Sequence, residues 1–152
     1  MQLRALYTVR FHYPDGWQVD LVGDAGTEEH HYYFAEGRCE GALEGRFRAG
    51  NHPRRRTDRT VAMNMQGFIE TDDGALIMID YKGYGRAYPP GRRQVVGAAW
   101  HVTSHEKYKH LNDAICVISG EVRVPKSEKP VEQAQVQLVF AVAELVWEAP
   151  PD

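Results

Sequence analysis

The sequence predicts an all-β fold of about nine strands with one short helical turn, arranged as a sandwich or a barrel. Apolar and aromatic residues recur in short runs, and turn residues separate these runs at the spacing typical of such folds. No long window shows the apolar period of an amphipathic helix. Gly37, Gly41 and Gly45 fall within strand-like sequence, where glycine often marks the bends that a barrel requires.

The first half of the chain supplies five strand-like segments. Pro14-Asp15-Gly16 predicts a turn between the first two, and residues 23–26 predict a loop after the second. The polar segment 49–58 predicts a long loop before the fifth. The five segments are Leu3–Phe11, Trp17–Val22, His30–Ala35, Gly37–Arg48 and Thr60–Thr71.

The second half supplies four more strands and the helical turn. A second irregular loop is expected over residues 83–93, and Ser104 is a suitable N-cap for a helical turn at Ser104–His110. The four strands are Ala75–Tyr81, Gln94–Thr103, Ala114–Val124 and Val136–Val146.

Composition bounds the class of protein. At 152 residues, with 43% hydrophobic and 26% charged residues, the chain fits one soluble globular domain over 1–148 and a short tail at 149–152. A net charge of −3 argues against nucleic-acid binding. Cys39 and Cys116 are too few for a disulfide framework and indicate a cytoplasmic protein. No apolar run approaches the length of a membrane span.

The last predicted strand is apolar on both faces at Val139–Ala143. Such a strand needs cover on both sides, either from the short helix or from a partner subunit. We therefore expect a homodimer or a higher homo-oligomer.

The Asp-Gly step in Glu70-Thr71-Asp72-Asp73-Gly74 is the strongest hairpin signal in the chain. A two-residue loop would pair even positions of the first strand with odd positions of the second, and a three-residue loop would reverse the faces. The two-residue register places two sets of side chains on one face: Asn64, Gln66, Phe68 and Glu70 from the first strand, with Ile77, Ile79 and Tyr81 from the second.

That mixture of polar and apolar side chains predicts a ligand cavity, because apolar walls with a few converging polar groups are typical of small-molecule sites. In the alternative, the opposite face with Met63 and Met65 forms an ordinary core and Glu70 lies in solvent. The cavity interpretation makes Asn64, Gln66 and Phe68 candidate substrate-binding residues.

Glu70, His101 and Tyr81 are the candidate catalytic residues. A carboxyl group among apolar side chains has a raised pKa, which suits a general acid or base. Small neighbours on one strand face leave room in front of His101, and Tyr81 could orient a carbonyl group. Each has a structural alternative: an exposed glutamate, a packed histidine or a packed tyrosine.

Other positions complete the candidate site. Trp100 would help to shape it and Asn112 would hold an oxygen atom. The arginine run 54–56 could steer a carboxylate or phosphate to a barrel mouth, although such runs are more often solvated surface. No metal is expected, because His30 and His31 point to opposite faces and the remaining histidines lack a third ligand.

Several motifs together resemble the domain-of-unknown-function 3237 family. These motifs are Gly37–Arg48, Arg56-Thr57-Asp58, the Glu70–Ile77 hairpin and Tyr108-Lys109-His110-Leu111-Asn112. The resemblance implies a small, closed, lipocalin-like antiparallel β-barrel without a cofactor.

The resemblance also bears on individual residues. Family members usually carry Asp and Arg where this chain has Asn64 and Gln66, which implies that these two residues and Glu70 share one functional face. Arg56 is a candidate substrate-binding residue, or it pairs with Asp58 to close one end of the barrel.

Two functions follow from the sequence. The first is a cofactor-independent enzyme that performs acid/base chemistry on a small organic molecule, of the isomerase, cyclase or lyase type. The second is a binding or carrier protein that holds the same ligand unchanged. A third alternative is a solidly packed barrel that serves only as an oligomer subunit.

Overall fold

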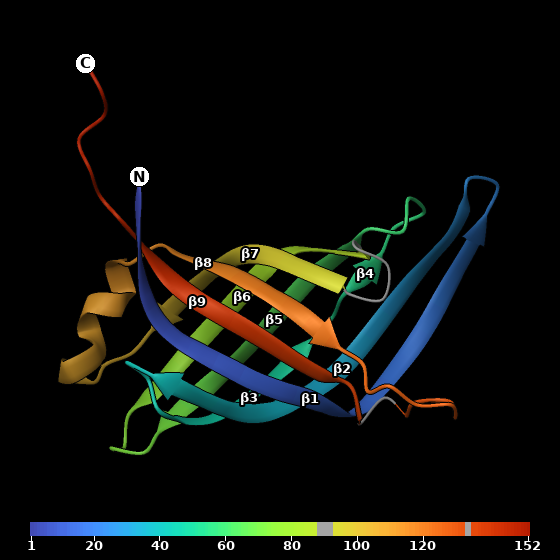
Figure 1. Cartoon of the computed structure of the whole chain (residues 1–152), viewed down its shortest axis with the longest axis horizontal. Helices are drawn as coiled ribbons and strands as arrows, with labels where there is room; N and C mark the ends of the chain where they lie inside the picture. The colour runs from blue at the N-terminus through green and yellow to red at the C-terminus, as the bar shows by residue number, and fades with distance from the viewer. Residues whose placement is uncertain (88–92, 133–134) are drawn as a thin grey trace.

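The computed structural model describes residues 1–87, 93–132 and 135–152 and shows one nine-stranded antiparallel sheet. Figure 1 shows the sheet curled into a barrel, with the helical segment η1 at one end. The elements are β1 (Gln2–Gly23), β2 (Gly26–Gly41), β3 (Gly45–Asn51), β4 (Arg54–Arg55), β5 (Val61–Thr71), β6 (Leu76–Ala87), β7 (Arg93–Val102), η1 (Glu106–Asp113), β8 (Cys116–Arg123) and β9 (Gln137–Val146).

Eight of the strands form a closed ring in the order β1-β9-β8-β7-β6-β5-β3-β2, because β1 pairs with both β9 and β2. The short strand β4 pairs with β2 and β5 beside the ring. Closure gives every strand of the ring two hydrogen-bonded neighbours, although the part of β1 beyond Phe11 pairs with β2 alone. The predicted all-β barrel with one short helical turn is therefore confirmed.

The two longest strands do not break where the sequence predicted. β1 continues through Pro14-Asp15-Gly16, and its pairing with β2 shifts by one residue between His12 and Asp15, so the predicted turn is a β-bulge. The chain reverses at Asp24 and Ala25, between the paired Gly23 and Gly26. Beyond the bulge, β1 and β2 form a hairpin that projects from the barrel; residues 16–33 are called the arm below (Figure 1).

The bulge changes which side chains of β1 face inward. Before it, the odd-numbered Val9 and Phe11 are buried in the barrel. After it, the even-numbered Gln18 lies opposite His31 and lines the same cavity as that histidine. A one-residue shift in a strand exchanges its two faces, so the bulge turns polar residues toward the end of the barrel.

The core fills the ring with alternate residues of every long strand. Phe11 packs against Phe47 and Phe140, with ring centroids 5.2 and 5.0 Å apart. The largest fully buried side chains are Tyr81, Phe11, Phe47, Phe140, Leu43, Met65, Ile69, Ile77, Leu111, Val9, Val142 and Cys39. Aromatic rings therefore close the middle of the barrel.

The hairpin between β5 and β6 has the three-residue loop Asp72-Asp73-Gly74. The amide of Gly74 donates to the Thr71 carbonyl at 3.0 Å, and Gly74 has a φ of +91° that favours glycine. This loop pairs Glu70 with Leu76 and Phe68 with Met78. The predicted two-residue register is therefore wrong.

The register reverses the predicted faces. Met63 and Met65 are buried with Ile77, Ile79 and Tyr81 inside the barrel. The set predicted to line the cavity lies on the outer face instead: Asn64, Gln66, Phe68 and Glu70.

Two smaller predictions also change. β6 extends to Ala87, into the segment expected to be irregular, while residues 88–92 of that loop lie outside the described residues. Within the described ranges, no helix has both the length and the apolar character needed to cross a membrane.

We predict that Gly67→Ala destabilises the barrel strongly. A Cβ atom at Gly67 would lie 2.2 Å from the Arg48 carbonyl oxygen of the neighbouring strand, so β3 and β5 would have to separate. We expect a loss of about 2–3 kcal/mol in the free energy of unfolding, measured by urea denaturation. In Gly74→Ala the new Cβ meets nothing within 4 Å, and only backbone strain of about 1 kcal/mol is expected. Equal losses in the two variants would contradict this account of strand packing.

Candidate functional site

A cavity of about 580 Å³ lies at the end of the barrel from which the arm projects. This volume is within the range of roughly 300–1,000 Å³ found for small-molecule sites. The apolar wall includes Val61, Met63, Val95, Val122, Leu138 and Phe140, and the polar lining includes Tyr13, Gln18, His31, Tyr33, Asn51, Arg55 and Arg93. The cavity therefore combines an apolar wall with several polar groups, of which Tyr13 and Asn51 are buried.

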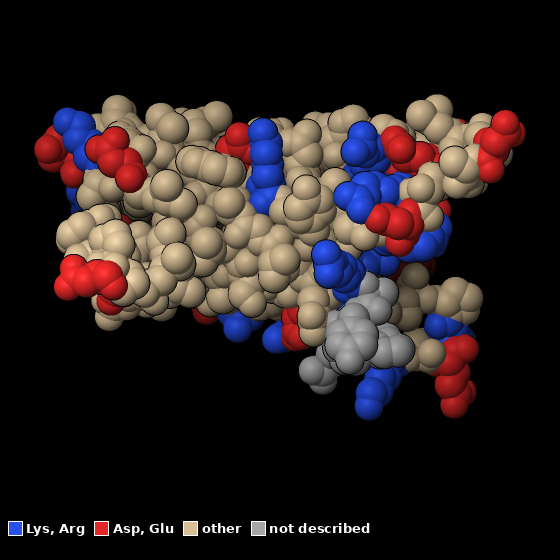
Figure 2. All heavy atoms as spheres, turned by 90° about the horizontal axis from the view of Figure 1, so that it is seen from above, with Lys and Arg blue, Asp and Glu red and all other residues tan. Residues whose placement is uncertain are grey.

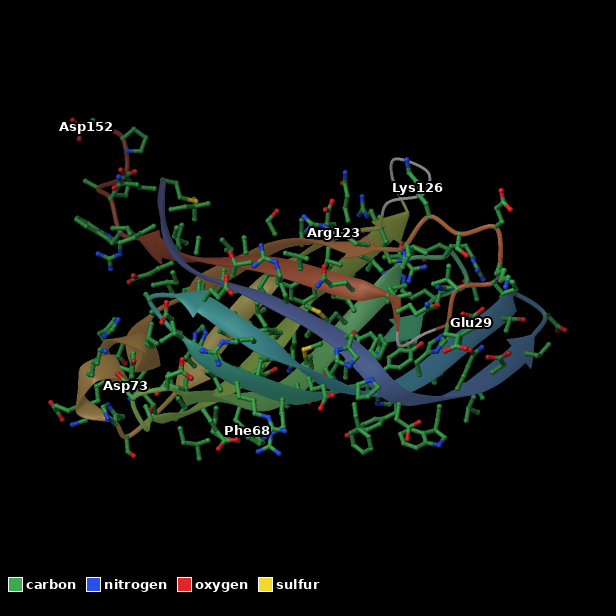
Figure 3. The ribbon with its side chains drawn as sticks, turned by 60° about the horizontal axis from the view of Figure 1, so that its bottom comes forward. Glu29, Phe68, Asp73, Arg123, Lys126 and Asp152 are labelled. Atoms are coloured by element: carbon green, nitrogen blue, oxygen red, sulfur yellow. The ribbon has the colours of Figure 1, made fainter. Side chains whose placement is uncertain are left out.

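Charged side chains gather toward the two ends of the molecule and are sparse over the middle of the face seen in Figure 2. Figure 3 separates the two ends: Asp73 lies near η1, whereas Glu29 lies toward the arm. Of the charged residues, Arg55 and Arg93 line the cavity.

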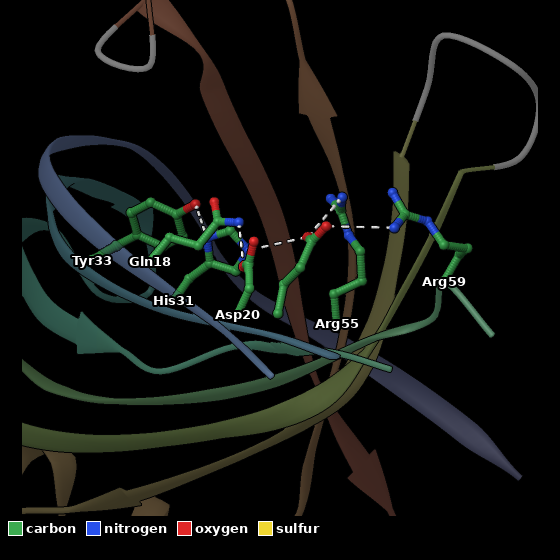
Figure 4. Close-up of polar contacts among 7 residues, drawn as sticks. Gln18, Asp20, His31, Tyr33, Arg55 and Arg59 are labelled. Carbon is green, nitrogen blue, oxygen red and sulfur yellow. Dashed lines mark hydrogen bonds and ion pairs between the residues drawn. The ribbon is translucent and has the colours of Figure 1, made fainter. Parts of the chain in front are cut away.

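A chain of polar contacts crosses the inner face of the arm (Figure 4). The Tyr33 hydroxyl lies 2.9 Å from Nδ1 of His31, and Nε2 of His31 lies 3.5 Å from the Glu29 carboxylate. Arg55 and Arg59 contact the same carboxylate at 3.1 and 3.4 Å. Glu29 and His31 are only 16% and 14% exposed, so these contacts are partly shielded from solvent.

Two tyrosines carry hydroxyl groups into the cavity. The rings of Tyr13 and Tyr33 stack with centroids 4.4 Å apart, and Asn51 donates to the Tyr13 hydroxyl at 2.8 Å. Burial raises the pKa of Tyr13 and of Tyr33, although the charges of Arg55 and Arg93 oppose the rise at Tyr33. Both phenols therefore keep their protons at neutral pH and can donate hydrogen bonds.

Tyr81 and His101 come together inside the barrel, away from the cavity. The Tyr7 hydroxyl lies 2.7 Å from Nε2 of His101 and is also hydrogen-bonded to the Tyr81 hydroxyl. Nδ1 of His101 has no hydrogen-bond partner among the described residues. None of these three side chains lines the cavity at the mouth, so the structure places two predicted catalytic residues in the sealed half of the core.

Glu70 and its predicted companions share a face, but it is the outer one. Arg48 donates to the Glu70 carboxylate at 2.6 Å and lies 5.0 Å over the ring of Phe68. Gln66 donates to Asn64 at 2.7 Å. The expected apolar surroundings of Glu70 are absent, because an arginine and solvent surround its carboxylate.

The remaining predicted residues are also separated from the cavity. Trp100 is 44% exposed on the outer face. Asn112 accepts a hydrogen bond from the Thr103 amide at 2.8 Å and donates to its carbonyl at 2.9 Å, which ties η1 to the end of β7. Arg56 pairs with Asp58 in the turn after β4, as the resemblance implied.

The loop of the family motif is held at the closed end of the barrel. The Tyr108 hydroxyl donates to Asp73 at 2.7 Å, and Lys107 contacts the same carboxylate at 2.7 Å. These contacts hold the pKa of Asp73 well below its usual range. Arg38 pairs with the adjacent Asp72. This part of the motif therefore serves the fold.

Sequence reasoning missed most of the cavity. It considered His31 only as a metal ligand and did not select Glu29, Tyr33 or Arg93. One signal was available: Glu29, His31 and Tyr33 alternate along one strand and so share a face. Of the 54–56 run, for which the sequence left a barrel mouth and solvated surface open, Arg55 lines the cavity.

The described residues contain no group of three or more His, Cys, Asp or Glu side chains arranged to hold a metal ion. The polar groups of the cavity are hydroxyl, imidazole, amide and guanidinium. Such groups suit hydrogen bonding, proton transfer and anion binding.

Comparisons with known proteins support the fold. A family model described as "Protein of unknown function (DUF3237)" matches residues 1–138. No curated protein matches the chain.

Three solved structures resemble the whole chain. A β-barrel-like protein from Acinetobacter baumannii AYE has a TM-score of 0.74 and 21% identity, with 94% of each chain covered. A protein of unknown function from Clostridium acetobutylicum has a TM-score of 0.75 and 17% identity, covering 96% of this chain and 100% of its own. A protein from Penicillium herquei, named only as an enzyme, has a TM-score of 0.63 and 19% identity, with 93% of each chain covered.

We predict that His101 makes the barrel sensitive to acid. Burial lowers the pKa of His101 from 6.5 to about 4, so the unfolded chain binds a proton more readily than the folded one. Neutral, buried His101 makes its full contribution to the free energy of unfolding above about pH 6.5. This contribution is lost as the pH falls toward 4, to a total of roughly 3 kcal/mol. Urea denaturation at several pH values should show this loss in the parent and a smaller one in His101→Gln. If the free energy of unfolding had the same pH dependence in the parent and in His101→Gln, His101 would not be the source of the acid sensitivity.

Proposed function

We propose a function for this chain, which belongs to the family described as "Protein of unknown function (DUF3237)", from the chemistry of its cavity. The protein binds a small organic molecule at the open end of the barrel and performs cofactor-independent acid/base chemistry on it. Isomerisation, cyclisation and elimination are the reaction types that such chemistry serves.

One observation carries this proposal: an apolar cavity is bordered by the series of polar side-chain contacts on the arm. Val95, Val122 and Leu138 form part of a wall suited to the body of an organic ligand. At the mouth of the same cavity, Tyr33 contacts His31, which in turn faces Glu29. The ligand and a proton-transfer group would therefore occupy one space.

These residues supply a balanced proton path. With the Nε2 proton of His31 directed at Glu29, Nδ1 is free to accept the Tyr33 proton. The Tyr33 oxygen takes a proton from the substrate as its own proton moves to Nδ1, and the imidazolium formed then faces the Glu29 carboxylate. The reverse movement returns the proton to another atom of the substrate and restores the starting state.

The charges around the cavity suit the intermediate of such a reaction. Removal of a proton leaves negative charge on the substrate, commonly on an oxygen atom. Arg55 and Arg93 line the cavity and would stabilise that charge. One structural neighbour, the protein from Penicillium herquei, is named an enzyme, which supports a catalytic use of this fold.

A carrier is the second candidate function. Its support is the wall of the cavity, which is mostly aliphatic and open at one end, as in barrels that hold small ligands. In a carrier, the contacts among Tyr33, His31 and Glu29 would only hold the arm in place.

We predict that Tyr33→Phe abolishes turnover while ligand binding persists, because the change removes one hydroxyl and keeps the ring. Native mass spectrometry of freshly purified protein would identify a co-purifying ligand. Incubation with a cell metabolite extract in D₂O, followed by liquid chromatography and mass spectrometry, would then detect deuterium incorporation or rearrangement. We expect a rate loss of about 100-fold or more in Tyr33→Phe.

Tyr32→Phe is the matched control, because Tyr32 is the adjacent tyrosine on the exposed face of the arm. It should behave as the parent does. A ligand released unaltered by all three proteins would favour the carrier, and full turnover in Tyr33→Phe would remove Tyr33 from the mechanism.

A further inference from the structure

One arginine at the cavity lacks a counter-ion. Arg93 begins β7, is partly buried and lines the cavity. Within the described residues it makes neither an ion pair nor a hydrogen bond through its side chain. Arg46 and Arg86 likewise have no ion pair in the described part of the chain, but both are exposed, where water solvates the charge. Among the described residues, Arg93 is therefore the arginine without an ion pair whose charge is partly shielded from solvent.

The surroundings of Arg93 leave its charge uncompensated. The charged groups that act on it most are Arg55 and Arg59, both positive, and the neighbouring polar groups are the phenols of Tyr13 and Tyr33. Burial and the charge of Arg55 lower the pKa of Arg93, in keeping with the missing carboxylate.

The carboxylate that contacts Arg55 at the cavity is already engaged. Glu29 contacts Arg55 at 3.1 Å, Arg59 at 3.4 Å and His31 at 3.5 Å. The Glu29 carboxylate thus faces two guanidinium groups and an imidazole, while Asp20, its partner in the strand register, accepts a hydrogen bond from Gln18. Within the described residues neither carboxylate forms an ion pair with Arg93, and a partly buried charge without a counter-ion is costly until such a partner arrives.

We infer that the ligand of the cavity is an organic anion with a single carboxylate, which binds Arg93 and has an apolar body seated against the valine-rich wall. This inference rests on the proposed function and names the class of its ligand.

Three features favour a carboxylate of this kind. The planar guanidinium of Arg93 can donate two parallel hydrogen bonds to a carboxylate. Tyr13, whose hydroxyl accepts a hydrogen bond from Asn51, keeps its own proton available as a further donor at the same cavity. A single unpaired arginine matches a single charge, and the volume of about 580 Å³ limits the body to a small molecule.

The probes for this inference are benzoate, 3-phenylpropionate and octanoate, each compared with its uncharged amide by isothermal titration calorimetry and ligand-observed NMR. In the parent protein we expect at least one acid to bind about 10- to 100-fold more tightly than its amide. Arg93→Met keeps most of the apolar stem and should remove that preference. Arg46→Met is the matched control on the outer face and should retain it.

A second measurement needs no ligand. Because Arg93→Met removes an unpaired, partly buried charge, its thermal midpoint should rise by about 2–4 °C, whereas that of Arg46→Met should not rise. A fall in the Arg93→Met midpoint would show that the charge is already compensated and would overturn the inference.

The outcomes separate this inference from the proposed function. Equal binding of acids and amides, or an acid preference that survives in Arg93→Met, overturns the anion assignment. A co-purified neutral ligand also overturns it but leaves small-molecule binding intact. A cavity that binds none of the probes and co-purifies with nothing overturns both.

Discussion

The extra residue that β1 carries at its bulge determines the character of the two ends of the barrel. Up to Phe11 the strand directs apolar side chains inward and completes the aromatic core. Beyond Asp15 the opposite set faces in, which brings Gln18 beside His31 at the cavity. A regular strand would have directed Trp17 and Val19 to the same place. The polar lining that the arm adds to the cavity therefore depends on one local irregularity in the pairing of β1 with β2.

The barrel contains two polar systems with different environments. Tyr7, Tyr81 and His101 form a hydrogen-bonded network that is buried inside the barrel. Such a network fixes the arrangement of the core but imposes a desolvation cost on any charged form. The groups of the arm, including His31 and Tyr33, border a cavity and can exchange protons with a bound molecule. Burial alone thus does not identify a site, because access to a ligand is also required.

The sequence was sufficient for the fold and insufficient for the site. The alternation of residues in each strand, together with the glycines and turns, indicated an all-β sandwich or barrel, and the resemblance to a known family indicated a closed barrel. The β5–β6 register failed because Asp72-Asp73-Gly74 suits a loop of either two or three residues, and one residue decides which face is buried. The bulge in β1 had no visible signal beyond Pro14-Asp15-Gly16, which more often marks a turn. Arg93 and Arg55 belong to strands that are far apart in the chain, and no local sequence pattern indicates that both line one cavity.

The motif loop at Asp73 lies at the end of the molecule remote from the cavity (Figure 3). Its contacts with Tyr108 and Lys107 secure the barrel without touching any cavity residue. Changes at such distant positions contribute independently to stability. A family member can thus keep the Asp-Gly hairpin and the Tyr-x-x-Leu-Asn helix while the side chains of its arm change. Such changes would alter which ligands it binds. A match in these two motifs therefore indicates a shared fold. The chemistry of each family member depends on the residues that line its own cavity.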